Sequence, residues 1–202
     1  MLTRVRTVAL LGVLVLGVPF VAAKYKIKEF QVHAAGDYAA HQSFQNLVIG
    51  AYPCNTLEKT LELFDTDKLF EKGLMPVLIV VQNDGSFPVE LDEDQIFLVD
   101  DSGQRYPTIP YTDVLLEINS KKSKSNLPNI QDLHKLVKKE MLLDFEHKAF
   151  GEKLIAPGST DHGVIFYRLP AGGNLEGHRL YLPEIVNRTN NARLMFFEFD
   201  LQ

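Results

Sequence analysis

The stretch Met75-Pro-Val-Leu-Ile-Val-Val-Gln-Asn83 decides the fold class of this chain of 202 residues. Its aliphatic residues, several of them β-branched, continue until Asn83-Asp84-Gly85-Ser86, a group typical of a tight turn. A run of this kind, ended by a turn, predicts a fully buried central strand.

Shorter apolar segments separated by turn residues lie further along the chain. We expect strands at residues 87–91, 95–99, 104–107, 163–168, 178–182 and 193–199. Short strands joined by turns at regular spacing pair with their neighbours in antiparallel fashion. The sequence therefore predicts one mainly β domain over residues 24–202, built as an antiparallel β-sandwich.

A short helix is expected before the central strand. Asn55-Thr-Leu-Glu58 has the spacing of a capping box, in which the first side chain accepts from the first turn and the glutamate reaches back. The helix should cover residues 56–64. Its packed stripe should be Leu57, Leu61 and Phe64.

Residues 110–150 change from β-branched sequence to a lysine-rich pattern with a helical period. This pattern predicts helices at 111–118 and 130–145 around a polar segment at 120–126. We interpret 110–150 as a helical insertion between two strands of the sandwich. It should form a semi-detached element over one end or edge of the sandwich.

The strand segments resemble a known group of proteins. The residues that carry this likeness are Pro76-Val-Leu-Ile-Val-Val-Gln-Asn-Asp84, Pro88-Val89, Ile96-Phe-Leu-Val-Asp100 with Gly103, Ala156-Pro-Gly158 and Gly163-Val-Ile-Phe-Tyr167. In this order they resemble small exported bacterial domains of immunoglobulin-like fold, over residues 74–182 without the helical insertion. The resemblance implies an envelope protein with an immunoglobulin-like sandwich, and it carries no catalytic residue.

The first 23 residues have the three parts of a signal peptide. They are the positive start Arg4 and Arg6, the apolar run 8–18 followed by Pro19, and the small-residue site Val21-Ala22-Ala23. We predict cleavage after Ala23 and an exported protein, periplasmic or secreted. An uncleaved segment that holds the protein at the membrane is the alternative, and no transmembrane helix is expected after cleavage.

Composition excludes several classes of function. The chain has 21 basic and 26 acidic residues and no basic tail, so we expect no nucleic-acid partner. Its single cysteine, Cys54, excludes an internal disulfide framework and any metal site built on several cysteines. The nearest cation in sequence is Lys59, so we expect Cys54 to be a buried, unreactive thiol.

No motif predicts a catalytic, cofactor or metal site. The six histidines are scattered without the spacing of a helical zinc motif: His33, His41, His134, His147, His162 and His178. Asp92-Glu93-Asp94 and Asp100-Asp101 could bind calcium, but we interpret them as turn residues that charge the rim.

Two further groups of polar residues are interpreted as structural elements and not as catalytic or metal sites. Gly158-Ser159-Thr160-Asp161-His162 is interpreted as a turn leading into a strand, because members of a catalytic triad converge from separate segments. Asp65-Thr-Asp67 is interpreted as the solvated exit from the first helix.

Lysines concentrate in the helical insertion. Between residues 121 and 148 there are seven lysines against four acidic residues, although the whole chain is acidic. The partner-binding candidates are Lys121, Lys122, Lys124, Lys135, Lys138 and Lys139. We interpret them as a surface for an envelope protein or an anionic surface. A solvated helix face would show the same pattern.

Together these features predict an exported, non-catalytic interaction or scaffold module of the cell envelope, which binds through its loops or helical insertion. Two alternatives are kept. One is a metal-dependent hydrolase whose histidines and acids converge only in the fold, and the other is a sandwich that binds a small ligand in a pocket under the insertion.

Overall fold

The computed structural model describes residues 24–120, 133–169, 175–194 and 196–201. Their strands form three four-stranded sheets in which every pair is antiparallel. The sheet that we call the central sheet has the order β1 (Ala40–Phe44), β2 (Leu47–Pro53), β3 (Leu74–Asn83) and β8 (Ser159–Arg168).

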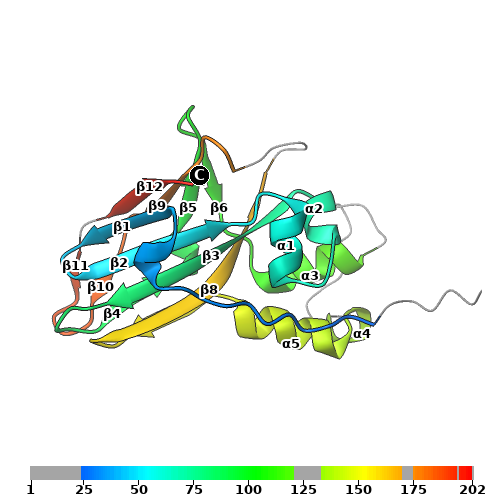
Figure 1. Ribbon diagram of the computed structural model, residues 1–202, viewed down its shortest axis with the longest axis horizontal. Helices are drawn as coiled ribbons and strands as arrows, with labels where there is room; N and C mark the ends of the chain where they lie inside the picture. The colour runs from blue at the N-terminus through cyan, green and yellow to red at the C-terminus, as the bar shows by residue number, and fades with distance from the viewer. Residues whose placement is uncertain (1–23, 121–132, 170–174, 195, 202) are drawn as a thin grey trace, which may run out of the picture.

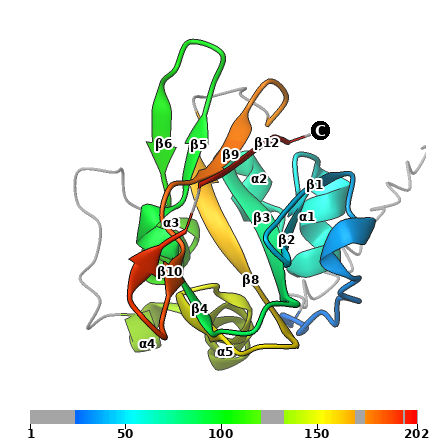
Figure 2. The same ribbon diagram turned by 90° about the vertical axis from the view of Figure 1, so that its left-hand side faces the viewer.

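Two smaller sheets complete the β structure. One has the order β11 (Ala192–Arg193), β10 (Val186–Asn187), β4 (Val89–Asp92) and β7 (Glu152–Ile155). The other has the order β12 (Phe197–Asp200), β9 (Arg179–Leu182), β5 (Phe97–Val99) and β6 (Arg105–Pro107). Figure 2 shows how the strands of the three sheets surround a common interior.

The helices lie together toward one end of the β structure, as Figure 1 shows. The α-helices are α1 (Leu57–Leu63), α2 (Lys68–Glu71), α3 (Tyr111–Asn119), α4 (Leu133–Leu136) and α5 (Lys139–Lys148). Two short 3-10 helices, η1 (Ala35–Asp37) and η2 (Glu93–Gln95), belong to loops. Among the described residues, no helix is long and apolar enough to cross a bilayer.

Strand β3 divides the molecule into two hydrophobic cores. Successive side chains of a strand point to opposite faces, and here both faces are buried. Val77 and Ile79 pack in the first core, between the central sheet and the smaller sheets. Leu78 and Val80 pack in the second core, between the central sheet and the helices. The predicted fully buried central strand is confirmed.

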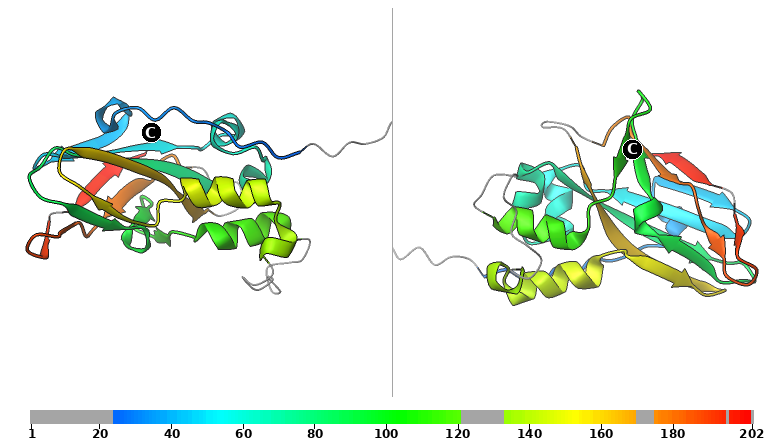
Figure 3. Two further views of the ribbon diagram at one scale, coloured as in Figure 1. Left: turned by 90° about the horizontal axis from the view of Figure 1, so that it is seen from below. Right: turned by 180° about the vertical axis from the view of Figure 1, so that it is seen from behind.

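The helices of the predicted insertion supply a large part of the second core. Phe145 of α5 is fully buried, its ring lies 4.2 Å from that of Phe64, and it stacks on Phe166 of β8 at 5.7 Å. Helix α3 buries Leu115 and runs beside α5, as Figure 3 shows. In chain order α3, α4 and α5 stand between β6 and β7. The expectation of a semi-detached element is wrong, because the buried side chains of these helices belong to the second core, which packs against the central sheet.

The mainly β, antiparallel class is confirmed, but the sheets differ from the prediction. A sandwich has two sheets, whereas these strands form three, and β1 also lies against β12 of a smaller sheet. The strand expected at 193–199 is divided into β11 and β12, which belong to different sheets. The helix expected at 130–145 is divided into α4 and α5 over the part of that range that is described.

Candidate functional site

An extended segment at the start of the described chain borders the candidate site. Residues 24–33, which we call the N-terminal strap, form neither helix nor strand. The strap starts beside α4 and α5 and passes α1 in Figure 1. Its burial alternates as in a strand: Phe30 and Val32 pack against the second core, whereas Glu29 and Gln31 are exposed.

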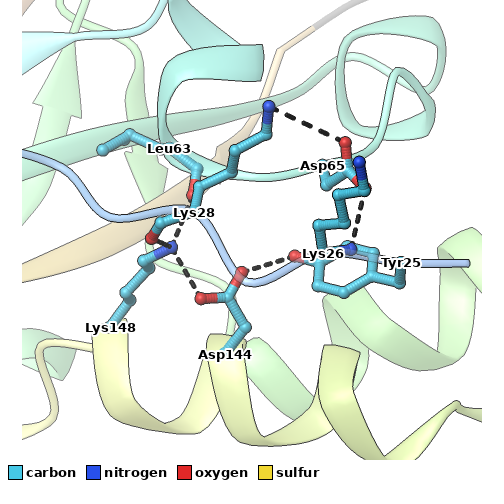
Figure 4. Close-up of polar contacts among 7 residues, drawn as sticks. All are labelled: Tyr25, Lys26, Lys28, Leu63, Asp65, Asp144 and Lys148. Carbon is cyan, nitrogen blue, oxygen red and sulfur yellow. Dashed lines mark hydrogen bonds and ion pairs between the residues drawn. The ribbon is translucent and has the colours of Figure 1, made fainter.

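Three side chains hold the strap in place, and Figure 4 shows them. The ammonium group of Lys148 lies 2.6 Å from Oδ1 of Asp144, one helical turn earlier on α5. It also donates to the carbonyl oxygens of Lys28, at 2.7 Å, and Leu63, at 2.6 Å. The hydroxyl of Tyr25 donates to Oδ2 of Asp144 at 2.5 Å. We call Tyr25, Asp144 and Lys148 the clasp.

Burial shapes the protonation of the clasp. It lowers the pKa of Lys148, while the bond to Asp144 acts in the opposite direction. It raises the pKa of Tyr25, and the bond to Asp144 raises it further. Each of the three ammonium hydrogens of Lys148 has an acceptor, and both oxygens of Asp144 have a donor. The clasp is therefore a satisfied buried network that ties the strap to α5 and to the end of α1.

Asp65 makes a second attachment. Its Oδ2 accepts from the backbone N–H of Lys26 at 2.8 Å, and its Oδ1 lies 3.8 Å from Nζ of Lys28. Asp65 directly follows Phe64, the C-cap of α1, and its side chain is 31% exposed, so it lies at the predicted exit from the first helix. The sequence did not predict that this carboxylate is also a partner of the strap.

An open groove lies between the strap and α1, and we call it the strap groove. It has a volume of about 880 Å³ and is lined by Lys28, Glu29, Phe30, Gln31, Leu57, Glu58, Leu61 and Glu62. A hollow of about 390 Å³ shares Phe30, Gln31 and Glu62 with it and extends it toward Tyr52.

The strap groove exists because α1 does not bury the stripe predicted from its sequence. The buried residues of the helix are Thr60 and Leu63, with Phe64 at its end. Leu57 remains 40% exposed, and Leu61 is only partly buried. Thr56 caps the helix by accepting from the N–H of Lys59, where a capping box would begin at Asn55. The N-cap is therefore one residue later than predicted.

The predicted lysine surface is only partly described. Lys121, Lys122 and Lys124 lie outside the described residues. Lys135 on α4, Lys138 and Lys139 at the start of α5 are all exposed, and they flank the exposed Leu136. Lys148, which shares their stretch of sequence, belongs instead to the clasp.

The start of the strap lies beside these lysines. Nζ of Lys24 is 3.1 Å from Oε1 of Glu140, in the first turn of α5. The predicted cleavage point, Ala23, immediately precedes this residue in sequence.

The Ser, Asp and His near residue 160 do not converge. Ser159, Asp161 and His162 lie along β8, where neighbouring side chains point to opposite faces. The hydroxyl of Ser159 donates to the carbonyl of Ala156, and Asp161 pairs with Lys153 at 3.3 Å. The interpretation as a turn that leads into a strand is confirmed.

In the acidic loops, the carboxylates of Asp92 and Asp100 accept hydrogen bonds from residues of their own turns. Oδ1 of Asp100 accepts from the hydroxyl and backbone N–H of Ser102 and from the N–H of Gln104, and Oδ2 accepts from Tyr106. The bond to the Ser102 hydroxyl is the main cause that lowers the pKa of Asp100 to about 2. Asp92 similarly accepts from Asp94 at the start of η2. In the part of the chain that the structure describes, no three histidine, cysteine or acidic side chains are grouped as metal ligands.

Cys54 is fully buried in the second core, as predicted. Burial raises the pKa of its thiol, and the charge of Glu62 acts in the same direction. A thiol in such surroundings has little thiolate character at neutral pH.

Sequence reasoning did not identify Tyr25 or the strap as functional elements. The spacing of Asp144 and Lys148 is visible in the sequence as a helical ion pair. Tyr25 is 119 residues away from its partner, and residues 24–33 have no turn or helix signal. The alternation of Phe30 and Val32 with the polar residues Glu29, Gln31 and His33 was the one available signal.

Comparisons with known proteins found only distant structural similarity. No protein-family model matches the chain, and no curated protein matches it. Among solved structures, the yjhA protein from Bacillus subtilis has a TM-score of 0.40 at 10% identity, over 72% of this chain and 78% of that one. The putative ApaA protein from Bordetella pertussis has a TM-score of 0.34 at 13% identity, over 82% of this chain and 98% of that one.

Proposed function

We propose that this protein is an exported, non-catalytic interaction module of the cell envelope, and that its α4–α5 lysine surface contacts an anionic lipid surface. The observation that carries the proposal is the position of exposed Lys135, Lys138 and Lys139 around exposed Leu136. Lysines near an anionic bilayer each contribute about 1 kcal/mol of attraction, and an exposed leucine can enter the interface.

The position of two of these lysines favours a role outside the helix. Lys138 is the N-cap and Lys139 the first residue of α5. A cation at a helix N-terminus opposes the helix dipole, at a cost of roughly 0.3–1 kcal/mol. These lysines therefore occupy positions that local helix stability disfavours.

The start of the strap supports the same orientation. Lys24 pairs with Glu140 next to these lysines, and the apolar run 8–18 precedes it in sequence. In an exported chain, that run engages the membrane during translocation. The lysine surface would then face the same membrane. Cleavage of the N-terminal segment after Ala23 stays a prediction. The immunoglobulin-like fold suggested by the sequence also stays a prediction.

Vesicle binding tests this proposal. Residues 24–202, which contain every described element, should sediment with phosphatidylglycerol vesicles and not with phosphatidylcholine vesicles. Lys138→Gln/Lys139→Gln should weaken the partition coefficient by roughly tenfold or more. The matched control is Lys68→Gln/Lys72→Gln, which neutralises two exposed lysines at α2. Equal losses in the two double variants would reduce the effect to net charge and overturn the proposal.

The metal-dependent hydrolase considered from the sequence has a separate test. A metal-dependent hydrolase should retain a stoichiometric metal ion after purification, which elemental analysis would detect. Among the described residues, no three histidine, cysteine or acidic side chains are grouped as metal ligands.

A further inference from the structure

We infer that the strap groove binds an extended segment of another protein that has alternating apolar and basic side chains. This site is distinct from the α4–α5 lysine surface, because it lies between the strap and α1. The inference therefore goes beyond the proposed membrane contact and does not depend on it.

The backbone of the strap can accept a new strand. Residues 29–32 are extended, and no backbone N–H or C=O of theirs is hydrogen-bonded to another described residue. The attachments of the strap lie on either side of them, at Lys28 and His33. An extended edge with unpaired backbone groups is the surface that β-strand addition uses.

The apolar residues of the groove supply binding surface for alternate side chains. Leu57 and Leu61 face it from α1, and Phe30 faces it from the strap. Leu57 is 40% exposed, whereas Thr60 and Leu63 of the same helix are buried. A strand presents every second side chain to one face, so a ligand with apolar residues at alternate positions would cover these groups while its backbone pairs with the strap.

The charges of the rim favour a basic ligand. Glu29, Glu58 and Glu62 line the groove and are exposed. Lys28 is the one lysine among the residues that line the groove, and its Nζ lies 3.8 Å from Asp65. Lys59 lines the neighbouring hollow and lies over the ring of Tyr52 at 5.1 Å. The rim is therefore net negative, which attracts lysine or arginine and repels acidic segments.

The clasp makes the strap a rigid edge. Lys148 and Asp65 fix its backbone at Lys28 and Lys26, and the hydroxyl of Tyr38 accepts from the N–H of His33. A receptor edge that is already ordered loses little conformational entropy on binding. The structure thus combines an ordered edge, an apolar floor and an acidic rim in one groove.

A synthetic peptide provides the first test. The probe is acetyl-Lys-Val-Lys-Val-Lys-Val-amide, titrated into 15N-labelled protein of residues 24–202. Saturable amide shifts should concentrate at residues 28–33 and 57–62. The same peptide with glutamate for lysine, or with proline for valine, should bind at least tenfold more weakly, because it has the wrong charge or lacks the backbone donors.

Variants of the protein locate the site. Glu58→Lys should weaken the basic peptide about tenfold, and Leu57→Ser should do the same through the lost apolar contact. Glu71→Lys is the matched control, since Glu71 is also an exposed glutamate on a short helix but lies outside the groove. Leu57→Ser changes no charge and should leave vesicle binding unchanged, so failure here is distinguishable from failure of the membrane proposal.

Three outcomes would overturn the inference. The first is equal binding of all three peptides, or shifts centred on the acidic hollow near Glu90 and Glu184. The second is a concentration-dependent dimer that Leu57→Ser abolishes, which would make a second copy the occupant. The third is loss of vesicle binding in Leu57→Ser, which would make the groove part of the lipid surface.

Discussion

The hydroxyl of Tyr25 donates a hydrogen bond of 2.5 Å to the carboxylate of Asp144, although 119 residues separate the two in sequence. Through this contact the start of the described chain becomes part of the packing of α5. Asp144 is 2% exposed and lies between Tyr25 and Lys148, so one carboxylate neutralises the buried ammonium and anchors the strap.

Asp144→Asn should destabilise the protein strongly. It leaves the Lys148 ammonium without its counter-charge, and breaking a fully buried pair costs roughly 3–5 kcal/mol. Lys148 keeps 18% of its side-chain exposure and two carbonyl acceptors, so we expect a loss of about 2–4 kcal/mol in the free energy of unfolding. Urea denaturation measures it.

The matched control for that change is Glu140→Gln. It breaks the exposed pair with Lys24 on the same helix and should cost at most about 1 kcal/mol. If the two variants lose the same stability, the clasp contributes no more than a surface ion pair.

Gly50→Ala should disturb the packing of η1 on β2. A Cβ at Gly50 would lie 2.2 Å from the carbonyl oxygen of Ala35 and 3.0 Å from the ring of Tyr38, so the backbone of η1 must move. Overpacking of this kind costs about 1–3 kcal/mol or more. Thermal unfolding of Gly36→Ala provides the comparison, because nothing lies within 4 Å of a Cβ there. A Gly50→Ala protein as stable as Gly36→Ala would refute this account.

Asp100→Asn should reduce stability at neutral pH and lose this effect in acid. The pKa of Asp100 in the folded protein is about 2, below the unfolded value of about 3.9. A carboxylate with a lowered pKa stabilises the fold above its unfolded pKa, and this contribution is lost as pH falls through the folded pKa.

The measurement is the melting temperature of wild type and Asp100→Asn from pH 6 down to pH 2. The two curves should approach each other below about pH 4. A separation that stays constant over this range would show that charge is not the origin of the effect.

Cys54 should resist thiol reagents in the folded protein. It is fully buried, and burial raises its pKa, so both access and thiolate fraction are low. Ellman's reagent should label less than a tenth of the thiol in native buffer within the time that labels all of it in urea. Rapid stoichiometric labelling under native conditions would contradict the observed burial.

The sequence predicted the elements whose signal is local. The β-branched run around Val77 identifies β3, and the turn at Asn83 identifies its end, since both depend only on neighbouring residues. The β1–β2 hairpin was not predicted because its turn is Gln45-Asn46, whose φ angles of 46° and 64° belong to the left-handed region where Asn-Gly is the usual signal.

The parts of the site that could not be predicted depend on distant contacts. Leu57 and Leu61 have the spacing of a packed stripe. In the structure they instead line the strap groove, which depends on where the strap lies relative to α1. Lys148 has the sequence context of a surface lysine, but the backbone carbonyls of Lys28 and Leu63 turn it inward. Helical periodicity predicts which residues share a face and does not predict what that face meets.

The central sheet is a wall shared by both cores, and this arrangement couples their stability. Leu78 and Ile79 are bonded neighbours, yet each belongs to a different core. Loosening either core therefore shifts peptide units that the other core also needs. We therefore expect that the second core does not unfold separately from the first. Heat should unfold both cores in one cooperative step, with equal calorimetric and van't Hoff enthalpies.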